Sequence, residues 1–430
     1  MNVARAGKRR EGGSDGRSGG QAPKQVRAGP RTLHRGPHPS GTGNGLAVGR
    51  RRSADRQQLS IDAHADDRRH VFDGFFGATA AGPLIGGIVA QADAWRLFFG
   101  LLALIGILNL GLGLLTVDEQ PPQNPERPID VLGLALAAVG TVLAFYGSYD
   151  IETGNPSSPV AWTIAGIGLL ALVALLVLEY RSDDPFIPVK PLSTSLPVLG
   201  VVCAMVSGAV FVALLELMET LFAQGRHLEP LASGLLVWPL TINTGLAAFV
   251  FWRLFTTKFI AIIPLAGMMS LALAALLIAT TALAPASDPT SIPFIVALLG
   301  IGAGSTVAPS LFLAAFGVPS TQIGRTFALV ELLRSAAAFL LGPAILGFAL
   351  AAGRGGLPTA PVRLAPLLDL VHLGAWVLFG TTILTIVALV ALFKTAGLVL
   401  RAPDLHAWIA EKQQALESPG VPPPSKAFTG

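Results

Sequence analysis

The sequence predicts an all-α polytopic membrane protein. Of its 430 residues, 52% are hydrophobic and only 13% are charged, about half the share of charge in an ordinary soluble domain. The apolar residues gather in stretches close to the ~20 residues that cross a ~30 Å hydrocarbon core as a helix. Glycine and proline are common inside these stretches, and membrane helices tolerate both where neighbouring helices satisfy the backbone.

About ten transmembrane helices are expected, separated by polar or proline-rich links. They lie at residues 75–92, 97–116, 131–148, 160–178, 196–215, 231–252, 259–283, 292–317, 327–352 and 370–393. An even number of spans puts both termini on one side of the membrane.

Basic residues near the span ends favour cytoplasmic termini, because cytoplasmic loops carry an excess of Lys and Arg. That orientation puts eight basic residues on the cytoplasmic side and four on the other. The eight are Arg127, Arg181, Lys190, Arg253, Lys258, Arg325, Lys394 and Arg401, and the four are Arg96, Arg226, Arg354 and Arg363.

The first two spans form a hairpin with a glycine-rich segment in its first helix. This segment contains Gly82, Pro83, Gly86 and Gly87. Glycines remove side-chain bulk, so a neighbouring helix can approach closely, and Pro83 frees one backbone carbonyl. In lipid such a break persists only where another helix or a cavity covers it, so we expect a helix contact here.

Residues 1–70 differ sharply from the rest. They hold 15 of the 30 Lys and Arg, 6 of the 26 acidic residues and no Phe, Trp or Tyr. A segment so poor in large apolar groups should be disordered. Three interpretations remain open: an arm for nucleic acid or anionic lipid, a solvated linker, or a stretch that is not the natural start of the gene. Its Arg, Gly and Pro bias resembles out-of-frame translation of GC-rich DNA, which favours the third, and no nucleic-acid partner is expected.

The hairpin carries a resemblance to a known family. The run A-x-x-x-G-P-x-x-G-G, which starts at Ala78, is followed by Trp95-Arg96-x-Phe98. It resembles the antiporter motif in the fifth helix of the major facilitator superfamily, in its fourteen-span drug:proton antiporter branch. Similar segments follow in the family's order, at 179–188, 232–239, 300–309 and 324–343.

The resemblance implies a partial major facilitator fold that lacks the first four spans. Residues 71–117 would be the last two helices of the N-terminal bundle, and residues 118–195 two linker helices with polar loops. Residues 196–400 would form the C-terminal six-helix bundle, and residues 401–430 a cytoplasmic tail.

Two pairs of ionisable residues lie within or at the ends of the spans, where charges are costly and tend to face the bundle interior or water. Glu331 and Arg334 have the i, i+3 spacing that allows pairing on one helix face. They predict either a structural ion pair or a cavity-lining pair that binds a charged substrate or responds to a proton. Glu216 and Glu219 have the same spacing and predict either a solvated end of a helix or a site for a proton or a cationic substrate.

The chain offers no catalytic residues, metal site or cofactor site by its motifs. It has a single cysteine, no phosphate-binding loop and no metal-ligand spacing, so we expect no enzyme. By resemblance it is a bacterial inner-membrane efflux antiporter of the multidrug-resistance kind, with small amphiphilic substrates, protons and the lipid bilayer as partners. The family places important acidic residues in its first and fourth spans, so transport would be impaired as encoded. The alternative is a truncated, non-transporting membrane remnant, scaffold or sensor.

Overall fold

The computed structural model describes the chain from residue 82 to residue 419, with gaps. The described residues are 82, 84–116, 130–153, 158–182, 185, 189–225, 227–281, 291–352, 364–409 and 413–419, and for 152–153, 224–225, 341–352 and 364–366 only the backbone is described. All of them belong to one unit, Asp67–Gly430. The predicted disordered tail, Pro83 and the link at 117–129 lie outside the described residues.

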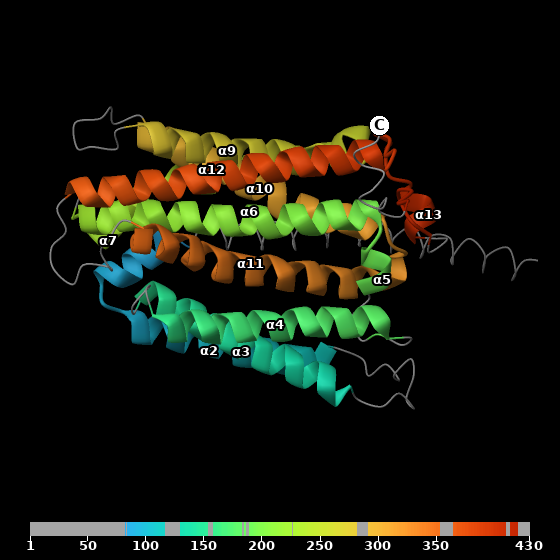
Figure 1. Cartoon of the computed structure of the whole chain (residues 1–430), viewed down its shortest axis with the longest axis horizontal. Coiled ribbons are helices and arrows are strands. Elements are labelled where there is room, and N and C mark those ends of the chain that lie inside the picture. Colours follow the sequence, from blue (N-terminus) through green and yellow to red (C-terminus); the bar gives the residue numbers. More distant parts are fainter. Residues whose placement is uncertain are drawn as a thin grey trace, which may run out of the picture. The chain divides into compact units, whose positions relative to one another are not determined.

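Helices dominate the described chain (Figure 1). Residues 84–91 are helical and precede the remaining elements. The elements are α2 Trp95–Thr116, α3 Val131–Thr153, α4 Pro159–Arg181, α5 Val189–Leu192, α6 Ser195–Thr220, the π-helix η1 Leu221–Gly225, α7 Pro230–Leu236, α8 Trp238–Leu254, the 3₁₀-helix η2 Lys258–Ala261, α9 Ile263–Thr280, α10 Ser291–Phe316, the 3₁₀-helix η3 Ser320–Gln322, α11 Ile323–Ala352, α12 Leu364–Thr395 and α13 Leu405–Ile409.

Eight described segments are long and apolar enough to cross a membrane. They confirm eight of the ten predicted spans, namely Trp95–Thr116, Val131–Ile151, Pro159–Arg181, Ser195–Ala223, Pro230–Leu254, Lys258–Thr280, Ser291–Phe316 and Leu367–Thr395. The predicted span 327–352 lies within the 30-residue α11, which is not one of these eight and carries Arg325, Glu331 and Arg334 in its first half. Only part of the predicted span 75–92 is described.

The span Pro230–Leu254 is broken at Val237, where α7 ends and α8 begins. Pro239, two residues later, has no N–H group, and its ring clashes with the carbonyl one turn earlier in a continuous helix. Val237 accordingly adopts φ −88° and ψ 4°. The Asn243 side-chain amide donates to the Pro239 carbonyl over 2.8 Å, so a polar group inside the helix is paired.

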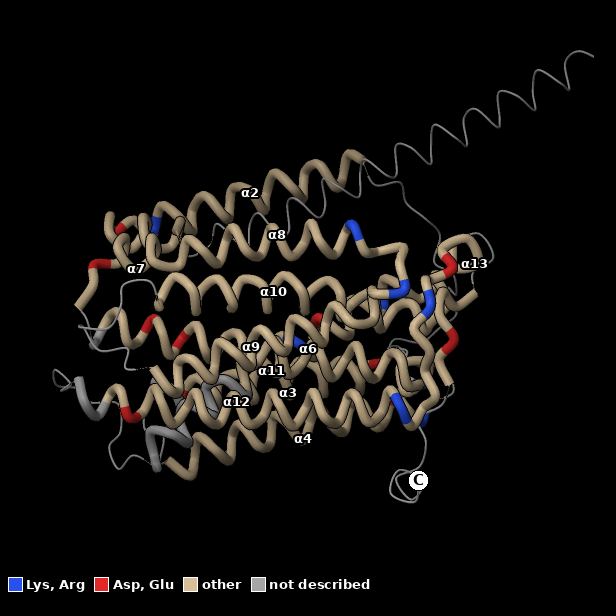
Figure 2. The backbone as a smooth tube through the Cα atoms, turned by 90° about the horizontal axis from the view of Figure 1, so that it is seen from above, with Lys and Arg blue, Asp and Glu red and all other residues tan. Residues whose placement is uncertain are grey.

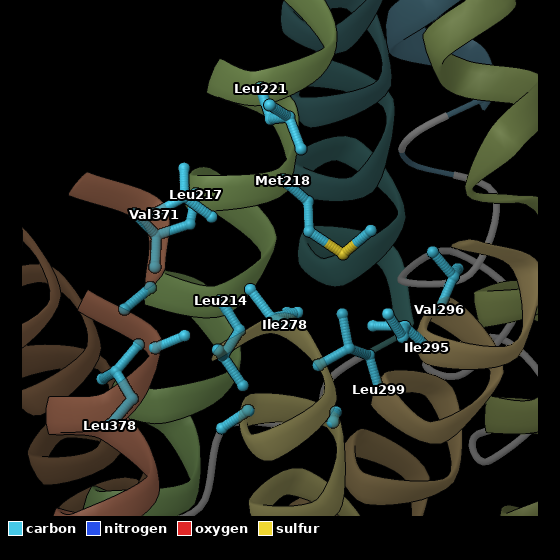
Figure 3. Close-up of a cluster of buried hydrophobic side chains, with 14 of the residues drawn as sticks. Leu214, Leu217, Met218, Leu221, Ile278, Ile295, Val296, Leu299, Val371 and Leu378 are labelled. Carbon is cyan, nitrogen blue, oxygen red and sulfur yellow. The ribbon is translucent and has the colours of Figure 1, made fainter. Parts of the chain in front are cut away.

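Helix α10 is the most enclosed of the eight membrane helices. In its most apolar stretch 61% of the residues are buried, whereas no residue of α2 is buried. A cluster of buried side chains from α6, α9, α10 and α12 fills the space between these helices (Figure 3). It includes Leu214, Met218, Ile278, Leu299 and Val371.

Alternate glycines of α10 allow this close packing. A Cβ atom added at Gly300 would lie 2.5 Å from the Leu240 carbonyl oxygen, and one at Gly304 would lie 2.6 Å from that of Thr244, both on α8. A Cβ at Gly302 would lie 2.5 Å from a methyl carbon of Leu271 on α9. Glycine therefore brings α8 and α9 against two faces of the same helix.

The C-terminal segment, residues 413–419, packs against the end of α10 and the start of α6. Backbone N–H groups of Ala415 and Leu416 donate to the Phe316 carbonyl at the end of α10, over 3.0 and 3.1 Å. The carbonyl of Pro419 accepts from the N–H of Ser195, over 3.0 Å, at the start of α6. Helix ends leave such groups without intrahelical partners, so the segment stabilises both ends.

Trp408, on α13, anchors the chain before this segment, and we expect Trp408→Ala to lower the free energy of unfolding by about 3 kcal/mol. The indole is 4% exposed, its Nε1 donates to the Val318 carbonyl over 3.0 Å, and its ring meets that of Phe316 edge-on. Unfolding in detergent, followed by tryptophan fluorescence or scanning calorimetry, measures the change. Ile409→Ala, the next residue of α13 and exposed, is the control, and an equal loss in both variants would contradict the anchoring role.

Candidate functional site

The glycine-rich segment lies against α7. A Cβ atom added at Gly87 would lie 2.8 Å from the Pro230 carbonyl oxygen and 3.4 Å from the Cα atoms of Leu231 and Gly234. Gly87 is buried in this contact. The expected close helix approach is therefore present at Gly87.

The other glycines of the motif differ from Gly87. No described atom lies within 4 Å of a Cβ added at Gly82 or at Gly86, and Pro83 lies outside the described residues. The sequence pattern does not distinguish these glycines, whereas among the described ones only Gly87 packs against another helix.

Gln91 extends the contact by one turn. Its Nε2 donates to Oε2 of Glu229, and its Oε1 accepts from the backbone N–H of Leu231, each over 3.4 Å. Leu231 lies in the first turn of α7, where N–H groups have no intrahelical partner, and the Glu229 side chain does not cap the helix. The side-chain amide of Gln91 thus supplies the missing acceptor from another helix.

Glu331 and Arg334 form the ion pair that their spacing allows. Nε of Arg334 donates to Oε2 of Glu331 over 2.9 Å, and Nη2 of Arg334 contacts Oε1 of the same carboxylate. The side chain of Arg334 is 18% exposed and that of Glu331 is 37% exposed. The pair is therefore partly enclosed, with the carboxylate on its more open side.

Gly208 of α6 makes room for Arg334. A Cβ atom added at Gly208 would lie 2.8 Å from Cγ of Arg334 and 3.3 Å from its backbone oxygen. The aliphatic stem of the arginine thus lies directly on the α6 backbone. Helix α11 packs against α3 as well as α6, and the Ser148 hydroxyl of α3 donates to the Phe339 carbonyl of α11 over 2.7 Å.

Glu216 and Glu219 lie in the last two turns of α6, just before the π-helix η1. Glu219 is exposed, and Glu216 is partly buried. Gly208, which adjoins Arg334, precedes Glu216 by eight residues, a rise of about 12 Å. The Glu331–Arg334 pair, on α11, therefore lies beside an earlier part of α6 than Glu216 and Glu219 do. The two candidate pairs do not form one cluster.

Sequence reasoning missed Gln91 and Gly208. Gln91 sits beside the turn to α2 with no motif around it, and Gly208 is one of many glycines in apolar helices. Only the partner helices reveal their roles. Within the described part of the chain, no group of three or more His, Cys, Asp or Glu side chains is placed to hold a metal ion.

The family profile described as Major Facilitator Superfamily matches residues 74–343, more than half of the chain. The chain belongs to the major facilitator superfamily. The matched region runs from the glycine-rich segment into α11, and the superfamily resemblance inferred from the motifs is thereby confirmed.

Curated relatives within the superfamily are similar to this chain at low identity. The uncharacterized MFS-type transporter YubD of Bacillus subtilis is 26% identical over 285 residues, which cover 65% of this chain and 54% of the relative. The drug efflux pump JefA of Mycobacterium tuberculosis is 26% identical over 287 residues, which cover 66% of this chain and 54% of the relative.

A third relative extends the same theme. The tetracenomycin C resistance and export protein of Streptomyces glaucescens is 25% identical over 178 residues, which cover 40% of this chain and 32% of the relative. The chain thus spans about half the length, or less, of these superfamily members.

Proposed function

We propose that this superfamily member is a secondary transporter that exports small amphiphilic compounds in exchange for protons. The observation that carries the proposal is the match, across about two thirds of the chain, to a relative named as a drug efflux pump. A second relative is named for the export of tetracenomycin C. The apolar helices and the scarcity of charge within them agree with a path for amphiphilic molecules.

The Glu331–Arg334 pair is the proposed site of proton coupling. Protonation of the Glu331 carboxyl would remove its charge and release the guanidinium of Arg334. The partly exposed position of Glu331 gives a proton access to it. Glu216 and Glu219 are proposed as a second site, for a proton or a cationic substrate, at the end of α6.

The helix contact at Gly87 is proposed to lie between the two bundles of the transporter. Residues 71–117 would belong to the N-terminal bundle, 118–195 to the linker helices and 196–400 to the C-terminal bundle. Gly82, Pro83 and Gly86 would complete the motif on the same helix. In transporters built from two bundles, one bundle rocks against the other around a central site, so this contact would form and break during transport.

We propose the bacterial inner membrane as the location, with cytoplasmic termini. Most described Lys and Arg residues gather at the end of the bundle that also carries α13 (Figure 2). They include Arg181, Arg253 and Lys394, in the last turns of α4, α8 and α12, and Lys258, at the start of η2. A basic end of this kind faces the cytoplasm.

Export is tested by ethidium accumulation in energised cells of a host that lacks its own efflux pumps. Cells with the chain should hold measurably less ethidium than cells with an empty vector, because an exporter opposes passive entry, and the difference should be modest, in line with the impairment that the sequence predicts. A protonophore should abolish the difference. Equal accumulation in both strains, with the protein present in the membrane fraction, would contradict the proposed function.

A further inference from the structure

The side chain of Gln91 clasps α7 at two points. Its amide donates to the carboxylate of Glu229 and accepts from the N–H of Leu231. A primary amide can do both at once, because it carries two N–H donors and a carbonyl acceptor. With the Glu229 carboxylate as its partner, the contact needs both a donor and an acceptor at position 91, and the glutamine amide supplies both.

A backbone turn directly after Gln91 fixes its position at the end of the helix. The helix ends in a turn in which the N–H of Ala94 donates to the Val89 carbonyl over 3.0 Å and that of Asp93 to the Ala90 carbonyl over 3.2 Å. Asp93 closes this turn at φ 49°, a left-handed conformation that costs a non-glycine residue energy. Gln91 is therefore fixed on the last turn, beside the start of α7.

Gly87 brings the two helices close enough for the clasp. It lies four residues, or about 6 Å, before Gln91 on the same helix and fits against Pro230 and Leu231. The packing at Gly87 and the hydrogen bonds of Gln91 thus meet the same first turn of α7. Together they form a contact with an apolar part and a polar part.

We propose that Gln91 is a latch that holds the segment 84–91 on α7 and keeps this end of the transporter closed. The latch rests on the proposed function, in which the two helices belong to bundles that separate during transport. Both hydrogen bonds are long and lie at an exposed position, so they can break and reform readily. In the structure both hydrogen bonds of the latch are formed.

The latch is tested by the reactivity of a thiol placed under the contact. Leu231→Cys, on a Cys203→Ala background, introduces one thiol beside Gly87, and opened membrane fragments give a water-soluble maleimide access from both sides. Gln91→Ala should raise the labelling rate about fivefold, because the closed state loses two hydrogen bonds. Ile88→Ala, exposed on the same helix, should leave the rate unchanged.

Two further variants separate the hydrogen bonds from the packing. Gln91→Glu should raise the rate above that of Gln91→Ala, because the new carboxylate repels that of Glu229. Adding Glu229→Gln should restore slow labelling, since the amide and carboxylate are then exchanged. A labelling rate that Gln91→Ala leaves unchanged, or an exchange that fails to restore it, would overturn the latch.

Labelling requires neither substrate nor export, so it separates the latch from the proposed function. Slow labelling that depends on Gln91, in a chain that exports no ethidium, would refute the transport proposal and retain the closed contact as a structural latch. Export that continues in Gln91→Ala, with labelling also unchanged, would retain transport and refute the latch.

Discussion

Glu331→Gln should lower the free energy of unfolding by roughly 2–4 kcal/mol, because it leaves the Arg334 guanidinium without its carboxylate. Arg334 is 18% exposed and lies on the α6 backbone at Gly208, so water can only partly replace the lost partner. The penalty is below that of a fully buried charge because the pair is partly open. Reversible unfolding in mixed micelles, with helical circular dichroism as the signal, measures the loss.

The double variant Glu331→Gln/Arg334→Gln distinguishes the two interpretations of the pair. It removes both charges, so it should recover most of the stability that Glu331→Gln loses. A purely structural pair would then allow ethidium export to recover as well. A coupling pair would leave export abolished in a folded protein, and we expect this second result.

Arg325→Gln is the matched control, since Arg325 is exposed in the first turn of the same helix. It should change the free energy of unfolding by less than about 0.5 kcal/mol. An equal loss in Arg325→Gln and Glu331→Gln would show that the charge of α11 as a whole, rather than the pair, determines stability.

Gly304→Ala should lower the free energy of unfolding by about 1–3 kcal/mol, because the added methyl group has no space. Its Cβ would lie 2.6 Å from the Thr244 carbonyl oxygen and 2.8 Å from Cβ of Ala247, so α8 and α10 must move apart. The same micelle unfolding experiment measures the loss.

Gly245→Ala provides the control on α8. A Cβ atom there has no described atom within 4 Å, and alanine is a better helix former than glycine. This variant should be as stable as the parent or slightly more so. If the two variants were equally destabilised, the close approach of α8 and α10 would not be the cause.

The positions of the membrane helices follow from local composition. Each span needs about 20 apolar residues, and this requirement can be counted along the chain without knowledge of neighbours. The segments Trp95–Thr116, Ser195–Ala223 and Ser291–Phe316 appear where their apolar runs predict them. The Glu331–Arg334 pair could be predicted for the same reason, because i, i+3 spacing is a property of one helix.

Packing partners could not be predicted, because they depend on residues far apart in the sequence. Gly82, Gly86 and Gly87 look alike in the sequence, yet only Gly87 adjoins another helix in the described chain. Gln91 and Glu229 are separated by 138 positions, and no pattern links them. The break at Val237 could be predicted only in part. Pro239 indicates it, but a proline does not always break a helix, since Pro309 lies inside an unbroken α10.

The sequence by itself determined the class of protein, the helices and the family, because hydropathy, helix spacing and motif order are all local properties of the chain. The tertiary structure decided which glycine packs, what Arg334 rests on and how Gln91 reaches the first turn of α7. These contacts arise only when helices from distant parts of the chain lie side by side, and within lipid close packing and paired polar groups hold them there.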